Sequence, residues 1–61
     1  MDITFIDIPK NRKVTYTNIT QIKISEPFGV SVNGYDDFAE ECYTIWMSFR
    51  DFTYFTVLKG E

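Results

Sequence analysis

The chain has 61 residues and a formal net charge of −3, and 44% of its residues are hydrophobic and 18% aromatic. We expect residues 1–61 to form a single domain, because domains usually run to about 50–200 residues. Six Phe, four Tyr and one Trp exclude a disordered tail, which typically lacks aromatic residues.

The small size makes an isolated monomer marginally stable. Folding would bury roughly 6,000 Å², about 60% of it apolar, which stabilises the fold by on the order of 90 kcal/mol. Conformational entropy opposes folding by about 1.5 kcal/mol per residue, again on the order of 90 kcal/mol. The lone Cys42 cannot form an internal disulfide, and the chain has no His, the commonest metal ligand. We therefore expect stabilisation by a partner subunit in a homo-oligomer.

The apolar pattern also bears on location. No apolar run approaches the roughly 18 residues of a membrane helix, and the N-terminus lacks a basic region followed by an apolar stretch. We expect a soluble, cytoplasmic protein with no membrane partner.

The composition predicts an all-β fold, since Ala39 and Leu58 are the only residues of their types and β-branched and aromatic residues dominate. Residues 3–8 form the first expected strand, and Pro9 and the residues after it form a turn. The second strand begins near residue 13, with Val14 and Tyr16 on one face.

Residues 14–24 break the period of two near Asn18 and Gln21, which predicts a bulge, a bend or a tight turn over 17–20. After a break at residues 26–27, Phe28, Val30 and Val32 alternate as in a half-buried strand.

Asn33-Gly34 is the strongest short turn signal of the chain. For residues 36–41 the sequence allows one short helix whose amides Asp36 caps, or an open acidic hairpin loop.

Residues 42–49 alternate cleanly, so we expect a central strand. One face carries Tyr43, Ile45, Met47 and Phe49, and the other carries Cys42, Thr44, Trp46 and Ser48. A last strand covers residues 54–58. The short connections require an antiparallel sheet, so the prediction is a small curled sheet or roll of five to six strands.

Three segments resemble short uncharacterised β proteins encoded by phages and mobile elements of Gram-positive bacteria. They are Ile3-x-Phe5-x-Asp7-x-Pro9, then Lys13-Val14-x-Tyr16 with Ile19-x-x-Ile22, and finally Phe52-x-Tyr54-Phe55-x-Val57. The resemblance spans most of the chain and implies a small β fold, but it supplies no functional residues.

Charge divides unevenly, with net +2 over residues 1–25 and net −5 over residues 26–61. One acidic surface would form if the loops of these residues lie together: Glu26, Asp36, Asp37, Glu40 and Glu41. The charges would keep an aromatic-rich domain soluble, dock a basic partner, or imitate nucleic-acid phosphates. Calcium is a further alternative, although the spacing does not match the calcium-binding loop.

Direct nucleic-acid binding would use a basic turn with an aromatic neighbour, formed here by Lys10, Arg12, Lys13 and Tyr16. The negative net charge disfavours this, because phosphate contacts supply most of such affinity.

The run of residues 49–55 contains four aromatic rings, for which core packing is the first explanation. Trp46 lies on the strand face opposite Ile45 and is expected to be exposed unless another chain covers it. Exposed aromatic patches usually mark interfaces, so we predict an interface at Trp46, with Tyr43 and Tyr54 as further candidates.

Catalysis has little support. Cys42 has no His to activate it and is expected to be a buried structural thiol. We expect no enzyme, no metal and no cofactor. The leading hypothesis is a non-catalytic protein-binding or structural accessory protein that self-associates and also binds a host or phage protein. The alternative is an acidic nucleic-acid mimic that inhibits a host nuclease or DNA-binding protein, which requires the five acidic residues to share one face.

Overall fold

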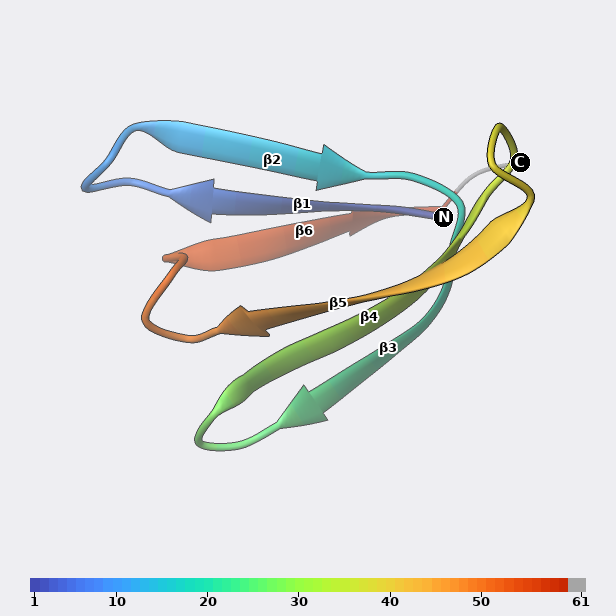
Figure 1. Ribbon diagram of the computed structural model, residues 1–61. Coiled ribbons are helices and arrows are strands. Elements are labelled where there is room, and N and C mark those ends of the chain that lie inside the picture. Colours follow the sequence, from blue (N-terminus) through green and yellow to red (C-terminus); the bar gives the residue numbers. More distant parts are fainter. Residues whose placement is uncertain (60–61) are drawn as a thin grey trace.

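The structure is a computed structural model that describes residues 1–59, and within this range it contains six strands and no helix (Figure 1). The first sheet has the order β2-β1-β6 and comprises β1 (Asp2–Asp7), β2 (Arg12–Tyr16) and β6 (Tyr54–Leu58). The second has the order β3-β4-β5 and comprises β3 (Ile19–Ser25), β4 (Gly29–Asp36) and β5 (Glu41–Ser48). The strands of each sheet pair antiparallel. The predicted all-β class is confirmed, with two three-stranded sheets that do not close into a barrel.

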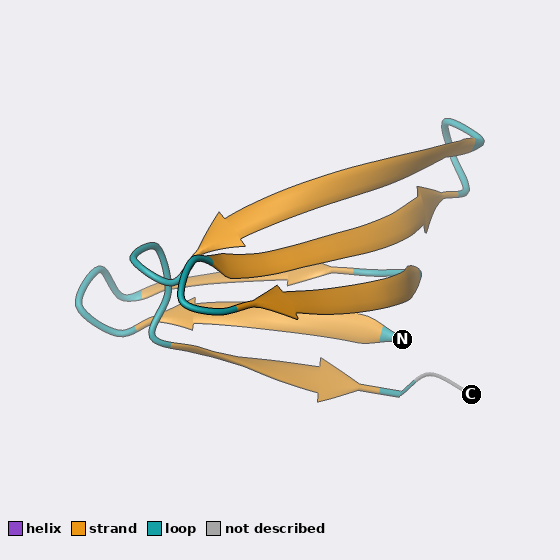
Figure 2. Cartoon of the chain, turned by 90° about the horizontal axis from the view of Figure 1, so that it is seen from below, coloured by secondary structure: helices purple, strands orange, loops and turns teal. Residues whose placement is uncertain are grey.

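The two sheets form separate layers with the core between their central strands, β1 and β4 (Figures 1 and 2). The buried apolar side chains of this core are Ile3, Phe5, Ile19, Val30 and Val32. The N-terminus and the end of β6 lie at the same end of the molecule, because β1 and β6 pair antiparallel with Asp2 opposite Leu58.

Alternation along β1 explains how the N-terminal segment contributes buried side chains to the core. Ile3, Phe5 and Asp7 are buried, and the residues between them are only half-buried. On β2, Tyr16 lies opposite Ile3 and Val14 lies opposite Phe5, so both share the core-facing side. The predicted facing of this second strand is confirmed.

Phe5 is the centre of an aromatic cluster within the core. Its ring centroid lies 4.9 Å from that of Phe52, 5.8 Å from that of Phe55 and 6.1 Å from that of Tyr16. Tilted and edge-to-face arrangements of this kind are the favoured geometry of aromatic pairs. Core packing therefore accounts for two of the four rings in residues 49–55.

The chain passes from the first sheet to the second through residues 17–18. Asn18 has φ of 56°, which Asn tolerates better than most residues. The amide of Ile19 donates to the carbonyl of Met1 at 2.8 Å, and the amide of Tyr35 donates to the carbonyl of Asn18 at 3.0 Å. A register shift follows between Ile19 and Gln21. The predicted irregularity is confirmed, and it is the point where the chain changes sheets.

The turn predicted at Asn33-Gly34 is wrong, because β4 continues through both residues. Asn33 ties the three strands together: its Nδ2 donates to Gln21 Oε1 at 3.1 Å, and Thr44 Oγ1 donates to its Oδ1 at 3.0 Å. Gly34 allows the ring of Tyr43 to pack against the backbone of β4, since a Cβ at this position would overlap the ring. Both residues that suggested a turn therefore have roles within the sheet.

β5 is an edge strand, so the prediction of a central strand is wrong. Its alternation is as predicted, since Tyr43, Ile45 and Met47 are half-buried on the side that faces the core. The thiol of Cys42 is free and exposed, which corrects the expectation of a buried structural thiol. Each of the two sheets has one covered face, and Cys42 lies on the uncovered face of its sheet.

Residues 36–41 form no helix, and the open hairpin alternative is confirmed. β4 and β5 pair up to Asp36 and Glu41, so that residues 37–40 form the connecting turn. Asp36 Oδ1 accepts from the amides of Phe38 at 3.0 Å and Ala39 at 3.1 Å, which is the predicted capping role. Glu40 completes the turn with φ of 54°.

The fold covers its apolar side chains incompletely. The solvent-accessible area is 4754 Å², whereas mass scaling gives about 4,100 Å² for a monomer of this size. The radius of gyration is 11.7 Å, against roughly 10.5 Å for a compact chain of this length. Among the described residues, five apolar side chains are buried and eleven large ones are exposed.

Candidate binding surface

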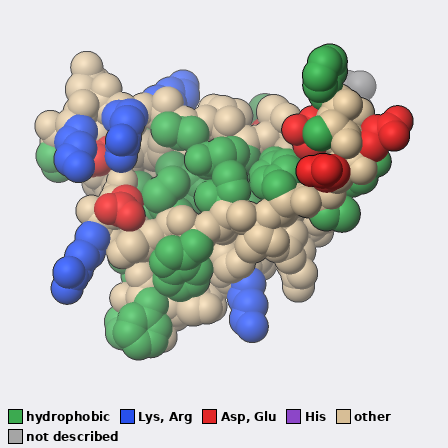
Figure 3. Space-filling model, in the orientation of Figure 1, with side chains coloured by type: hydrophobic (Ala, Val, Ile, Leu, Met, Phe, Trp, Pro, Cys, Tyr) green, Lys and Arg blue, Asp and Glu red, His purple; other side chains and the backbone are tan. Residues whose placement is uncertain are grey.

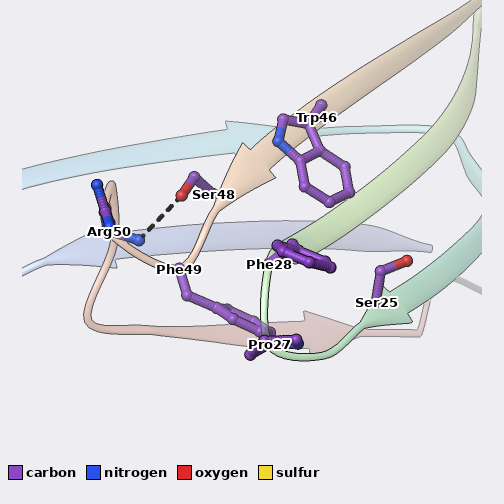
Figure 4. A pocket seen from close by; sticks show the side chains of 7 residues that line it. All are labelled: Ser25, Pro27, Phe28, Trp46, Ser48, Phe49 and Arg50. Carbon is purple, nitrogen blue, oxygen red and sulfur yellow. Dashed lines mark hydrogen bonds between the residues drawn. The ribbon is translucent and has the colours of Figure 1, made fainter.

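The candidate site is a hollow on the outer face of the β3-β4-β5 sheet, at the end where the β3–β4 turn lies. Its volume is about 770 Å³, within the range of ligand-binding clefts. We call it the aromatic hollow, and it is lined by Ser25, Pro27, Phe28, Trp46, Ser48, Phe49 and Arg50 (Figure 4). Apolar surface predominates, so the site suits an apolar group.

Three rings of the aromatic hollow are exposed to solvent. The exposed fraction is 69% for Phe28, 52% for Trp46 and 36% for Phe49. Figure 4 shows Phe28 next to Trp46, with the Phe49 side chain extending toward Pro27. Solvent-exposed aromatic groups in one patch are typical of interaction surfaces.

Backbone structure holds these rings in place. The amide of Phe49 donates to the carbonyl of Phe28 at 3.0 Å, which extends the β4–β5 ladder past its last strand pair. Gly29 leaves the room that the Trp46 ring needs, since a Cβ at Gly29 would lie 3.0 Å from Trp46 Cζ2. The cis peptide bond Glu26–Pro27 lies in the adjoining turn. Phe28 thus leaves the alternation of β4, which corrects the prediction that it shares a face with Val30.

Charges of both signs occur around the aromatic hollow, since Glu26 lies between the lining residues Ser25 and Pro27, and Asp51 follows Arg50. Arg50 lines the hollow, and its backbone amide donates to Ser48 Oγ at 3.2 Å (Figure 4). Lys23 lies on the same sheet face, with Ser31 between it and Trp46.

The acidic residues do not form the single surface that the sequence suggested. Four of them, Asp36, Asp37, Glu40 and Glu41, lie in and around the β4–β5 hairpin, whereas Glu26 lies in the turn at the other end of β4. Figure 3 shows acidic side chains gathered at the hairpin end and most of the basic ones at the opposite end. The nucleic-acid mimic thus lacks the shared face that it requires.

The β4–β5 hairpin displays a phenylalanine at its tip. Phe38 is 100% exposed, which is unusual for a side chain of this size. The hairpin is anchored beneath it, because Asn18 Nδ2 donates to Asp37 Oδ2 at 2.8 Å. Together with the bonds that Asp36 accepts, this bond connects the tip to the crossover between the sheets.

Tyr43, one of the predicted interface residues, faces the core side and not the aromatic hollow. Its hydroxyl donates to the carbonyl of Thr17 at 2.7 Å. Desolvation raises the pKa of Tyr43 above its usual value of 10.0, with smaller contributions from the charges of Asp36, Tyr16 and Asp2. The side chain therefore joins β5 to the crossover between the sheets, a structural role.

Tyr54 is exposed but lies on the other sheet. It pairs with Ile6 on the outer face of β2-β1-β6, while its neighbour Phe55 lies opposite the buried Phe5. The three predicted interface residues therefore occupy three different surfaces, and Trp46 alone belongs to the aromatic hollow.

The basic turn does not combine with its predicted aromatic partner. Arg12 and Lys13 start β2, whereas Tyr16 ends the same strand on the core-facing side and packs against Phe5. The exposed ring that lines a hollow together with Arg12 and Lys13 is that of Tyr54, not that of Tyr16.

Within residues 1–59, no group of three or more Cys, Asp or Glu side chains could hold a metal ion. The same part of the chain contains no helix that is long and apolar enough to cross a membrane.

Sequence reasoning missed three site residues: Phe28, Phe38 and Phe49. Phe38 carried a signal, because a phenylalanine between acidic residues in a loop has no apolar periodicity to bury it. Phe28 follows a proline at a strand end, and Phe49 precedes the charged pair Arg50-Asp51, so both stand where a strand stops.

No protein-family model, curated protein or solved structure matches the chain at a significant level.

Proposed function

We propose that this chain is a non-catalytic protein-binding domain that self-associates through the outer face of the β3-β4-β5 sheet. The observation that supports this most strongly is the aromatic hollow, where Trp46 and two phenylalanines are exposed in one patch. The resemblance to small phage and mobile-element proteins suits a cytoplasmic accessory factor that also contacts a host or phage protein.

The large exposed area of the single chain supports self-association. The lone chain exposes roughly 600 Å² more than mass scaling gives for a monomer of 7.2 kDa. A stable interface buries about 800 Å² per partner, which is about a sixth of the 4754 Å² available. Burial of apolar surface contributes about 25 cal/mol per Å². Covering the excess exposed area in an interface would therefore stabilise a dimer.

The test is the molecular mass in solution of the wild type and of two matched variants, measured by sedimentation equilibrium. Trp46→Ala removes a half-exposed ring from the aromatic hollow, and Tyr54→Ala removes a ring of similar exposure from the opposite sheet. We expect the wild type and Tyr54→Ala to dimerise, and Trp46→Ala to dissociate at least tenfold more readily.

Circular dichroism provides the control that both variants keep the β fold. A wild type that stays monomeric at every concentration would contradict the proposal. An equal loss of dimer in both variants would show that the Trp46 face has no special role.

A further inference from the structure

We propose that the outer face of the β2-β1-β6 sheet binds single-stranded nucleic acid, with a base stacked on Tyr54 and the backbone phosphates next to Arg12 and Lys13. This activity goes beyond self-association, and it uses the sheet that does not carry the aromatic hollow. The inference therefore does not depend on the oligomeric state.

The site is a hollow at the end of the sheet where the β1–β2 turn lies. Its volume is about 350 Å³, and its lining includes the ring of Tyr54 and two cations, Arg12 and Lys13. We call it the Tyr54 hollow. This volume is at the lower end of the range for small-molecule sites, so it suits one nucleotide unit of a strand.

A cross-strand row places the ring and an ammonium group on the same face. Ile6 on β1 lies opposite Lys13 on β2 and opposite Tyr54 on β6. The row faces outward, because the adjacent row, with the buried Phe5 at its centre, faces the core. Neighbouring strands lie about 4.8 Å apart, so the backbones of Lys13 and Tyr54 are roughly 10 Å apart. A base on the ring thus leaves its phosphate within reach of the long lysine side chain.

The Tyr54 ring is available for stacking. Its exposed fraction is 46%, and Ile8, which also lines the hollow, is 62% exposed. The close aromatic pairs of residues 1–59 all involve other rings. Stacking on an aromatic side chain supplies much of the affinity of proteins that bind single strands, and it accepts any base. An exposed ring beside cations is the arrangement that such binding requires.

Cations outnumber acids at the Tyr54 hollow. Arg12 and Lys13 are exposed and line it, and Lys10 lies in the adjoining turn. Asp7 is the one acidic residue in the described lining, and it is buried on the core-facing side of β1, while Asp51 in the loop before β6 does not line the hollow. Figure 3 shows that acidic side chains gather at the β4–β5 hairpin, at the other end of the molecule. The local charge, and not the net charge of −3, determines what a bound phosphate meets.

Hydroxyl groups continue the outer face beyond the ring. Thr4 lies opposite Thr15 and opposite Thr56 in the next outward-facing row, and the hydroxyl oxygens of Thr4 and Thr15 are 2.9 Å apart. Threonine hydroxyls commonly contact phosphate and sugar oxygens. The sheet therefore offers a polar path for the part of the strand that leads away from the hollow.

The first experiment measures binding by fluorescence anisotropy at low salt. The probes are labelled oligothymidylate and oligouridylate of about 12 nucleotides, a length within the usual site sizes of small β domains that bind single strands. We expect the wild type to bind at least one probe, and a preference between them identifies DNA or RNA as the better ligand. Tyr54→Ala should raise the dissociation constant at least about fivefold. Tyr54→Phe keeps the stacking surface and should leave the constant unchanged, as should Trp46→Ala, which removes an exposed ring from the other sheet.

The second experiment tests the phosphate contacts through their dependence on salt. Each phosphate contact to a single strand contributes about 0.7 to the slope of log affinity against log salt concentration. Arg12→Gln with Lys13→Gln should therefore lower this slope by about 1.4. Lys23→Gln, on the other sheet, is the matched control and should leave the slope unchanged.

The outcomes separate this proposal from self-association. Absence of binding to both probes at low salt overturns it, and so does a Tyr54→Ala variant that binds as tightly as the wild type. Equal affinity for inorganic polyphosphate would show charge attraction without stacking, and it would also overturn the proposal. A wild type that stays monomeric and still binds the probes through Tyr54 would contradict self-association and support nucleic-acid binding.

Discussion

Gly34→Ala tests the packing that joins β4, β5 and the crossover. A Cβ at Gly34 would lie 2.5 Å from the hydroxyl oxygen of Tyr43 and 2.8 Å from its Cε1, so the ring must move. Overpacking of this kind costs about 1–3 kcal/mol, and loss of the 2.7 Å bond to Thr17 adds about 1 kcal/mol. We expect Gly34→Ala to lower the free energy of unfolding by about 2–4 kcal/mol, which a domain this small can scarcely tolerate.

A double-mutant cycle isolates the cause. Tyr43→Ala removes the ring that the new methyl group would meet, so Gly34→Ala in that background should be neutral, or stabilising by about 0.5–1 kcal/mol because alanine has less backbone freedom than glycine. The coupling energy should therefore reach about 2 kcal/mol or more. Urea unfolding followed by circular dichroism measures it, at one protein concentration because association raises apparent stability. Equal costs of Gly34→Ala in both backgrounds would refute the assignment.

Three other predictions concern the turns and the inner face. Glu40→Gly should raise the free energy of unfolding by about 0.5–1 kcal/mol, since it relieves a positive φ, while Ala39→Gly, the neighbouring control, should lower it in the same urea assay. Deprotonation of Tyr43 should destabilise the fold: its pKa is raised in the folded state, so its contribution is complete below pH 10 and is lost as the pH rises through the folded pKa. Tyr43→Phe should flatten that alkaline decline, and an identical decline in the variant would count against it. Gly29→Ala should lower the free energy of unfolding by about 3 kcal/mol, because the added Cβ meets the backbone of Met47 and Ser48. An unchanged thermal midpoint would show that the two strands can move apart at this position.

The sequence predicted the strands well where the alternation of apolar residues and the flanking turn residues indicated the same bounds. The last strand, residues 54–58, has the predicted bounds, because a charged pair precedes it and Lys59 follows it. The break near Asn18 was visible as a lapse in alternation, and only its purpose, the passage between sheets, required the structure.

Failures of prediction arose where tertiary contacts decide. Asn33-Gly34 has turn propensity, but hydrogen bonds to both neighbouring strands and the space for the Tyr43 ring keep it inside β4. Strand order is not a local property, so the clean alternation of residues 42–49 could not show that β5 lies at an edge.

The predicted exposure of Trp46 is confirmed, because strand parity places it on the face opposite Ile45. The same parity places Tyr43 on the core-facing side, which argued against its choice as an interface residue. Tyr54 could not be compared with Trp46 from the sequence, because they belong to different sheets. Phe38 lies outside every strand, where no periodicity gives its direction.

The central claim is that this chain leaves its aromatic hollow uncovered until a second copy covers it. Trp46 is the single tryptophan and lies in that hollow, so its fluorescence reports the covering directly. The measurement is the emission maximum of the wild type over several orders of magnitude of dilution, in parallel with the sedimentation mass. We predict a shift to longer wavelength on dilution that coincides with the change from dimer to monomer. A maximum that stays constant while the mass changes, or a mass that never exceeds that of one chain, would contradict the claim.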